Sequence, residues 1–302
     1  MEKERIESKK FKHIVISGGH VWGIQALGAI TKCIEQGVLD LCHIESIHAT
    51  SVGSILALVL ALKPDIKDIV DYFIRRPWRH LIEKFDATPI EIYHNKGIFN
   101  IELINNMLSP ILKSRDISLD ITIEEFFKET GVEIFIYSTE LNSYISECMS
   151  YKNYGHWRIL DAIYASCSLP ILFKPIIQDG KCYVDGGFLA NYPLEKCIHQ
   201  FSNINEVLGI SLGHTVGVSE MLLTEESTLL EHLSILLVKL YNHLLFPLGK
   251  TELPYEIKIQ SRIINIDYLL KIINSSEEIM SLYEDGYVQM SKLLEKDIWK
   301  NR

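Results

Sequence analysis

The chain has 302 residues, of which 47% are hydrophobic, so it is long enough for one large or two ordinary folded domains. Its formal net charge of −9 argues against nucleic acid as a partner, because binding phosphates requires a basic face. The six cysteines are scattered without a Cys-x-x-Cys pair, which argues against a disulfide framework or a zinc site and favours a reducing compartment.

The N-terminus is mostly charged and lacks the apolar core of a secretory signal, so we expect residues 1–11 to form a flexible tail. No stretch approaches the roughly 18 uninterrupted apolar residues of a membrane-spanning helix. We therefore expect a cytoplasmic protein, with peripheral binding to a membrane left open. No repeat, low-complexity tract or linker divides residues 12–302, which predicts a single α/β domain.

The first expected strand, residues 12–17, leads into a glycine-rich turn, G-G-H-V-W-G at 18–23. Residues 24–36 have apolar side chains at helical spacing and predict a helix after the turn. Backbone N–H groups at such a junction stabilise negative charge. The alternatives are a structural tight turn or a weak nucleotide-binding loop, although neither G-x-G-x-x-G nor a P-loop lysine is present.

The second strand-to-helix junction carries a serine. An apolar run precedes A-T-S-V-G-S at 49–54, and an apolar helical run follows it. This pattern is typical of a nucleophile elbow, in which Gly53 leaves room for the sharp turn that carries Ser51. Ala49 stands where the usual pattern has its first glycine. The alternative is an ordinary turn in which Ser51 caps the helix.

The rest of the chain alternates between helical and strand patterns, with residues 78–100 expected to be irregular. Ser276 is expected to cap the last helix, and Thr122 with Glu125 to form a capping box. This alternation predicts a three-layer α/β/α fold with a mostly parallel central sheet. Helices are expected at 65–76, 101–112, 122–130, 159–166, 229–245 and 276–296, and strands at 132–137, 144–150, 181–184, 207–212 and 256–266.

A serine nucleophile needs a base and donors for the oxyanion. Asp185 is one candidate base, because it ends an apolar strand and is followed by Gly186 and Gly187, which let the backbone pass close by. The alternative is a plain Asp-Gly turn. A Ser-His-Asp esterase would instead use a histidine late in the chain, and the candidates are His199, His214, His232 and His243.

Taken in order, the glycine turn, the serine elbow and the Asp-Gly-Gly sequence resemble the patatin-like phospholipase family. Residues 122–141 resemble the family's segment leading into its A-T-D-L stretch, and residues 161–170 resemble its A-S-x-x-x-P helix. Residues 175–193 follow its terminal catalytic motif. The similarity covers residues 12–215, about two thirds of the chain, and leaves 216–302 as a helical C-terminal part.

The resemblance implies a three-layer lipid acyl hydrolase that cleaves carboxyl esters of phospholipids or related lipids. It implies that Ser51 is the nucleophile and Asp185 the base, with no histidine in the chemistry. No cofactor or metal is expected, and activity should persist in a chelator. The implied oxyanion hole consists of backbone N–H groups at Gly18, Gly19, His20 and Val52.

The glycine turn departs from the family's pattern at two positions. His20 replaces the third glycine, and it would be strained if that position requires a positive φ. Its ring points either into the cleft or to solvent. Trp22 replaces a basic residue and either packs or rests at a lipid headgroup. The competing hypothesis is therefore a catalytically weak or inactive lipid-binding protein with the same fold.

The run from 229 to 248 is a candidate membrane-contacting element, because leucines follow one side of its expected helix. The alternative is that this side packs on the protein's own core. The leucines in question are Leu233, Leu236, Leu237, Leu240, Leu244 and Leu245.

Overall fold

The computed structural model describes residues 11–85, 88–201, 203–215, 223–244, 252–261, 271–272, 274–296 and 299. Within these residues the centre is an eight-stranded sheet in the order β10-β9-β1-β2-β4-β8-β7, with β5 paired to β4 outside this path. The strands are β1 (His13–Ile16), β2 (Ser46–Thr50), β4 (Glu133–Glu140), β5 (Ile145–Met149), β7 (Ile176–Gln178), β8 (Lys181–Asp185), β9 (Val207–Thr215) and β10 (Glu256–Ser261).

The five strands from β10 to β4 run parallel, whereas β8 and β5 are antiparallel to β4. Every residue of β1 and β2 is buried, as expected of parallel strands covered on both faces. Because β1 and β2 are parallel neighbours, the turns that follow them meet at one edge of the sheet. This edge receives the glycine turn and the serine.

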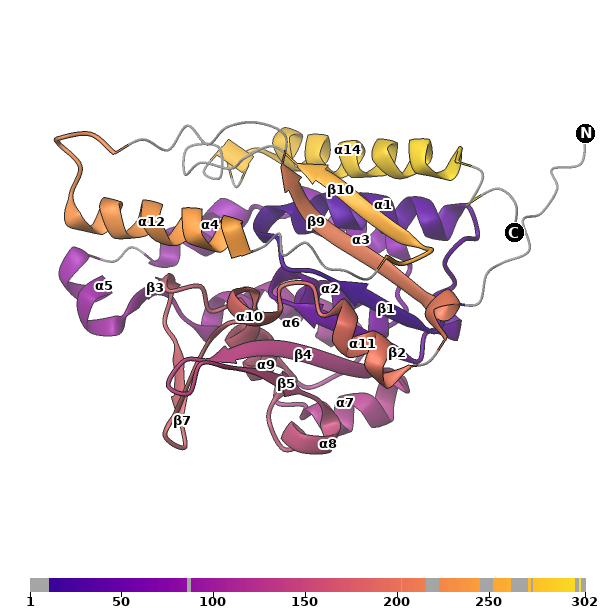
Figure 1. Ribbon diagram of the computed structural model, residues 1–302, viewed down its shortest axis with the longest axis horizontal. Coiled ribbons are helices and arrows are strands. Elements are labelled where there is room, and N and C mark those ends of the chain that lie inside the picture. Colours follow the sequence, from indigo (N-terminus) through magenta and orange to yellow (C-terminus); the bar gives the residue numbers. More distant parts are fainter. Residues whose placement is uncertain are drawn as a thin grey trace, which may run out of the picture.

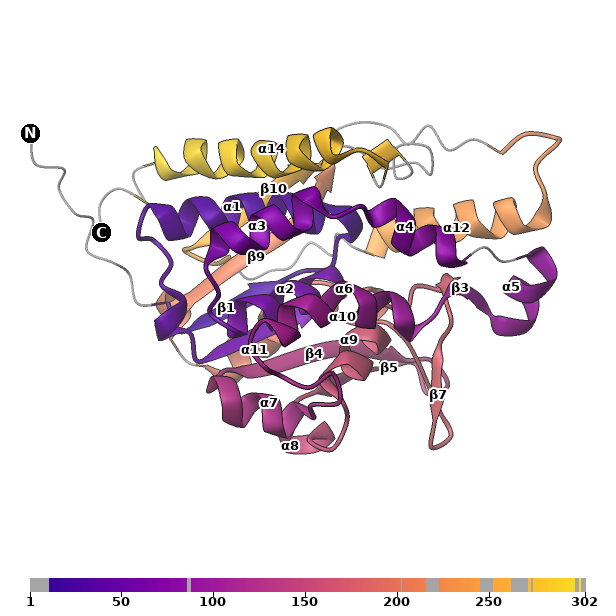
Figure 2. The ribbon, with the colours of Figure 1, turned by 180° about the vertical axis from the view of Figure 1, so that it is seen from behind.

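Helices cover both faces, which confirms the three-layer α/β/α fold with a mostly parallel sheet. Figure 1 shows α11 in front of the sheet, and Figure 2, from behind, shows α3 and α6 in front of it. The helices are α1 (Gly23–Glu35), α2 (Val52–Ala61), α3 (Ile66–Arg75), α4 (Trp78–Ile82), α5 (Pro89–Asn95), α6 (Ile101–Lys113), α7 (Ile123–Thr130), α8 (Tyr151–Tyr154), α9 (Ile159–Cys167), α10 (Gly187–Ala190), α11 (Leu194–Gln200), α12 (Leu229–Leu244) and α14 (Ser276–Leu294).

The last helix, α14, lies along α1 at the top of Figure 1. Two glycines allow this close approach. A Cβ at Gly28 of α1 would collide with the carbonyl oxygen of Tyr283, and a Cβ at Gly286 of α14 would collide with that of Gln25. Contacts between the two backbones therefore join the C-terminal helix to the helix that follows the glycine turn.

The expectation that residues 78–100 are irregular is wrong. They form α4, α5 and the short strand β3 (Gly97–Phe99), which pairs with β6 (Ile171–Phe173). Helix α5 begins with a capping box between Thr88 and Glu91, which is a local signal visible in the sequence. The capping box at Thr122 and Glu125 is confirmed.

The cap of α14 also differs from the expectation. It is Ser275, not Ser276, because the hydroxyl of Ser275 accepts a 3.2 Å hydrogen bond from the N–H of Glu278. Three expectations lie partly outside the described residues: the tail at 1–11, the end of the run at 229–248, and the end of the strand at 256–266. Among the residues described, no helix is both long and apolar enough to cross a bilayer.

Candidate active site

Ser51 occupies the sharp turn between β2 and α2. Its backbone angles are φ 53° and ψ −127°, a region that residues with side chains rarely adopt. The turn fits because Gly53 has no side chain: a Cβ there would meet the carbonyl oxygens of Ile16 and Ser17 at 2.7 and 2.8 Å. Ser51 stands at the N-cap position of α2, but its hydroxyl makes no capping hydrogen bond, so it does not cap the helix through its side chain.

The hydroxyl of Ser51 instead donates a 2.8 Å hydrogen bond to Oδ2 of Asp185, and both residues are buried. The other carboxylate oxygen, Oδ1, accepts from the N–H of Gly187 at 2.7 Å. A Cβ at Gly186 would collide with the carbonyl oxygen of Tyr137 in β4. The N–H of Gly187 therefore holds the carboxylate, and the missing side chain of Gly186 lets the chain pass close to β4.

Ser166, near the end of α9, supports this arrangement and was not singled out from the sequence. Its hydroxyl oxygen accepts from the N–H of Ser51 at 2.7 Å, and the same hydroxyl donates to the carbonyl oxygen of Tyr137 at 2.6 Å. Its own carbonyl oxygen accepts from the N–H of Gly186 at 3.2 Å. Ser166 thus joins the serine turn to the segment that carries Asp185. It lies inside the A-S-x-x-x-P segment, but the pattern does not reveal this contact.

The glycine turn approaches Ser51 from β1. The N–H of Gly18 donates to the carbonyl oxygen of Asn191 at 3.0 Å, so this amide is not available to an oxyanion. The N–H groups of Gly19 and Val52 have no hydrogen-bond partner among the described residues. A Cβ at Gly19 would meet Leu212 of β9 at 2.7 Å, which explains the second glycine.

His20 has a φ of 52°, so the third position of the turn does take the left-handed conformation that favours glycine. Burial lowers the pKa of His20 to about 4, so its ring is neutral near pH 7. The residue is half-buried, and its ring centroid lies 6.2 Å from that of Trp22. Trp22 is 2% exposed and packs in the core, so the alternative that it rests at a lipid headgroup is wrong.

Cys167 is a buried thiol next to the Ser51–Asp185 pair. Burial raises its pKa, and the nearby charge of Asp185 raises it further. Its sulfur lies 4.0 Å from the hydroxyl of Ser54, the third residue of α2. The thiol therefore stays protonated and does not provide a competing thiolate nucleophile.

The late histidines lie on several elements: His199 on α11, His214 on β9, and His232 and His243 on α12. The side chains of His214 and His243 are outside the described part of the structure. Across the described residues, no group of three or more His, Cys, Asp or Glu is arranged to hold a metal ion.

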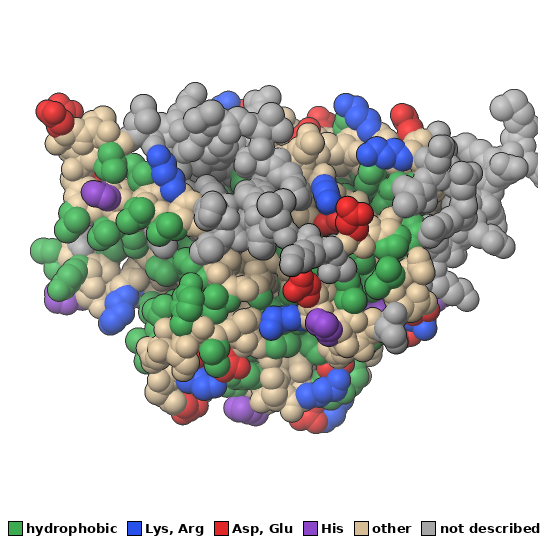
Figure 3. Space-filling view, in the orientation of Figure 1, with side chains coloured by type: hydrophobic (Ala, Val, Ile, Leu, Met, Phe, Trp, Pro, Cys, Tyr) green, Lys and Arg blue, Asp and Glu red, His purple; other side chains and the backbone are tan. Residues whose placement is uncertain are grey.

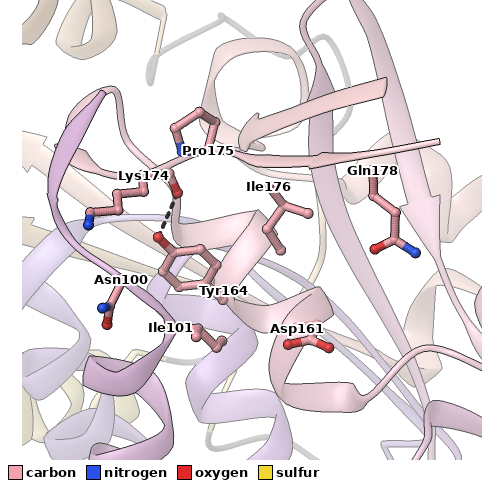
Figure 4. Close-up of a pocket in the computed structure, with 8 residues that line it drawn as sticks. All are labelled: Asn100, Ile101, Asp161, Tyr164, Lys174, Pro175, Ile176 and Gln178. Atoms are coloured by element: carbon pink, nitrogen blue, oxygen red, sulfur yellow. Dashed lines mark hydrogen bonds between the residues drawn. The ribbon is translucent and has the colours of Figure 1, made fainter. Parts of the chain in front are cut away.

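The pocket drawn in Figure 4 lies beside α9, between the start of α6 and the segment before β7. There the hydroxyl of Tyr164 donates to the carbonyl oxygen of Lys174 at 2.6 Å, and Asp161 also lines the pocket. Neither Ser51 nor Asp185 lines this pocket. It is therefore separate from the pair.

Comparisons with known proteins point to one family. Residues 14–198 match the family described as patatin-like phospholipase. An uncharacterized protein of Acanthamoeba polyphaga mimivirus is 26% identical, over 67% of this chain and 69% of its own. A probable lipid hydrolase of Invertebrate iridescent virus 6 is 24% identical, over 67% and 68%. A lysophospholipase of Kluyveromyces lactis is 30% identical over 61% of this chain but only 11% of its own.

The structural comparison agrees on the fold. The crystal structure of VipD from Legionella pneumophila superimposes with a TM-score of 0.54 at 17% identity, and the match covers 94% of this chain and 67% of that one.

Proposed function

The chain belongs to the patatin-like phospholipase family, and we propose that it hydrolyses carboxyl esters of phospholipids or related lipids through a Ser51–Asp185 dyad. The observation that carries the proposal is the 2.8 Å hydrogen bond from the hydroxyl of Ser51 to Oδ2 of Asp185. A serine hydroxyl is a weak nucleophile unless a base accepts its proton, and this carboxylate is in place to do so.

In the proposed reaction, Oγ of Ser51 attacks the ester carbonyl carbon while its proton passes to Oδ2 of Asp185. The bond to the leaving alcohol then breaks, and the alcohol takes that proton. Water enters next, loses a proton to Asp185 and attacks the acyl-serine. The bond to Oγ then breaks, the fatty acid leaves, and Asp185 returns the proton to Oγ of Ser51. The hydrogen bond from Gly187 to Oδ1 keeps Oδ2 directed at the serine through both steps.

The oxyanion formed in each step needs donors. The N–H groups of Gly19 and Val52 support this role, because neither has a hydrogen-bond partner among the described residues. The first N–H of helix α2 also lies at the positive end of the helix dipole. Loss of one such donor typically costs on the order of 3–4 kcal/mol of barrier.

We propose further that the protein meets its substrate at a lipid surface. Leu233, Leu236 and Leu240 lie on one side of α12 and are 47%, 47% and 51% exposed, so for these residues the core-packing alternative is wrong. Leu229, on the same side, is 74% exposed. The side chains of Leu237, Leu244 and Leu245 lie outside the described part of the structure. Ile90 and Tyr93 of α5 are 70% and 81% exposed. Figures 1 and 2 both place α12 and α5 at the same end of the molecule, where Figure 3 shows hydrophobic side chains gathered.

One contact connects α12 to the segment that carries Asp185. Helix α12 contacts α10, which begins at Gly187, two residues after Asp185. A lipid taken up beside α12 would therefore have a short path to Ser51. The net charge of −9 disfavours an anionic bilayer, so we propose a surface of zwitterionic lipid.

The test of the function is the release of fatty acid from phosphatidylcholine and of p-nitrophenol from a soluble ester. Ser51→Ala and Asp185→Asn should each abolish both activities while the protein stays folded. A fluorophosphonate should label the wild type and fail to label the Ser51→Ala variant. If either variant hydrolysed these substrates at the wild-type rate, the proposed dyad would be wrong.

The left-handed φ of His20 supports one second candidate, a catalytically weak lipid-binding protein. A wild-type protein that binds phosphatidylcholine vesicles, but neither turns over an ester nor reacts with the fluorophosphonate, would establish that candidate. The esterase alternative predicts that His214→Ala is inactive, whereas the dyad predicts full activity.

A further inference from the structure

We infer that the side-chain amide of Asn191 is a hydrogen-bond donor to the oxyanion, which makes Asn191 a catalytic residue of the proposed site. This inference rests on the proposed function. Asn191 follows α10 and is 4% exposed. Its Oδ1 is buried and has no hydrogen-bond partner among the described residues.

The amide of Asn191 is aimed at the space between the glycine turn and Ser51. A Cβ built on Gly18 would collide with Oδ1 of Asn191, and the same Cβ would lie 3.2 Å from Cβ of Ser51. Asn191 and Ser51 therefore both lie against Gly18, and they can approach it this closely because residue 18 has no side chain. The carbonyl oxygen of a bound ester has to lie close to Ser51, within reach of this amide.

Hydrogen bonds hold Asn191 in this place. Its backbone carbonyl oxygen accepts from the N–H of Gly18 at 3.0 Å, and the carbonyl oxygen of Ala190 accepts from the hydroxyl of Thr50 at 2.6 Å. The first of these removes the Gly18 amide from the oxyanion hole. The side chain of the same asparagine supplies a replacement donor.

A buried carbonyl oxygen without a partner is unfavourable, and the oxygen and NH₂ of an asparagine amide exchange places when the amide rotates by half a turn. In the rotated position an N–H of Asn191 is directed at Gly18, next to Ser51, and can donate to the negative charge that develops there. Because that charge exists only after attack by Ser51, the donor stabilises the transition state more than it stabilises the bound ester.

The test compares three substitutions at this position with the wild type. Asn191→Asp keeps the shape but cannot donate when ionised, Asn191→Ala removes the group, and Asn191→Ser restores a smaller donor. With p-nitrophenyl butyrate we expect kcat to fall about 10²- to 10³-fold in the first two, with KM changed by less than about threefold. The serine variant should recover at least about tenfold over the alanine variant.

A matched control is Asn105→Asp in α6, whose Oδ1 is also buried without a partner among the described residues. It should keep the wild-type kcat. Each kcat is divided by the concentration of sites that a fluorophosphonate labels at completion, so partial unfolding does not mimic a loss of catalysis. The initial rate of this labelling should fall in Asn191→Asp as well.

Full activity of Asn191→Asp, or equal activity of the serine and alanine variants, would overturn the inference and leave the dyad intact. A wild type that is neither active nor labelled would instead overturn the proposed function, and the role of Asn191 with it.

Discussion

The N–H of Ser51 donates a 2.7 Å hydrogen bond to the hydroxyl of Ser166, which lies 115 residues further along the chain. This bond holds a backbone conformation that a serine rarely adopts, and the same hydroxyl is anchored to the carbonyl oxygen of Tyr137. The strained turn is therefore supported by α9 and β4, elements that are remote in sequence. A substitution at Ser166 tests how much the proposed chemistry depends on that support.

Ser166→Ala should lower kcat about tenfold and the free energy of unfolding by about 1–3 kcal/mol. The reason is that the N–H of Ser51 and the carbonyl oxygen of Tyr137 both lose a buried partner. Urea denaturation and ester hydrolysis measure the two effects. The control is Ser46→Ala, a buried serine at the other end of β2 that is hydrogen-bonded to His13. It should lose stability and keep kcat, and an unchanged kcat in Ser166→Ala would contradict the positioning role.

His20→Gly should raise the free energy of unfolding by about 1 kcal/mol and leave kcat at or above the wild-type value. Glycine adopts the observed φ of 52° without the clash that a Cβ causes. Lys63→Gly is the matched control, because Lys63 has a φ of 48° at the far end of α2. Both variants should gain stability in thermal denaturation. A large loss of kcat confined to His20→Gly would show that the imidazole ring itself takes part.

Stability should fall as the solution is acidified below about pH 6.5, and His48 should account for much of the fall. Burial in β2, together with the proximity of His13, lowers the pKa of His48 to about 3. In the unfolded chain His48 therefore becomes protonated near pH 6.5, whereas in the folded protein it stays neutral until about pH 3. One such histidine costs about 2 kcal/mol between pH 7 and pH 5.

His48→Gln should flatten this pH dependence, since glutamine does not titrate and can still reach the hydroxyl of Tyr137, which lies 2.9 Å from Nδ1 of His48. Urea denaturation at pH 7, 6 and 5 gives the slope. His156→Gln, at an exposed histidine, should leave the slope unchanged. An equal slope in the wild type and in His48→Gln would refute the assignment.

The combined variant Leu229→Gln and Leu233→Gln should bind phosphatidylcholine vesicles at least about tenfold more weakly, because two exposed apolar side chains lose their favourable transfer into lipid. Hydrolysis of a soluble ester should not change. Sedimentation with vesicles measures the binding. The matched control replaces Met280 and Val288, exposed residues of α14, by glutamine and should bind as the wild type does. Unchanged sedimentation of the α12 variant would disprove the membrane surface.

Several elements follow from the sequence because their causes are local. The strand, turn and helix around Ser51 can be predicted from an apolar run, small residues and a second apolar run. The capping box at Thr122 works in the same way, since its partners are three residues apart. The sequence does not predict helix α5, although Thr88 and Glu91 carry the same signal, because a short amphipathic segment shows little periodicity.

The sequence by itself determined the order of the motifs, and through it the family and the two residues proposed as the dyad. Tertiary structure alone decided their environment. Strand β8 pairs antiparallel with β4 and so places Asp185 beside Ser51, and Ser166 accepts a hydrogen bond from the N–H of Ser51. The N–H of Gly18 is hydrogen-bonded to Asn191, and leucines of α12 are exposed. The physical reason is the distance along the chain over which each interaction acts. Dihedral preferences and caps act over a few residues, whereas these contacts join atoms from segments far apart in the chain, and no local pattern specifies which of them will meet.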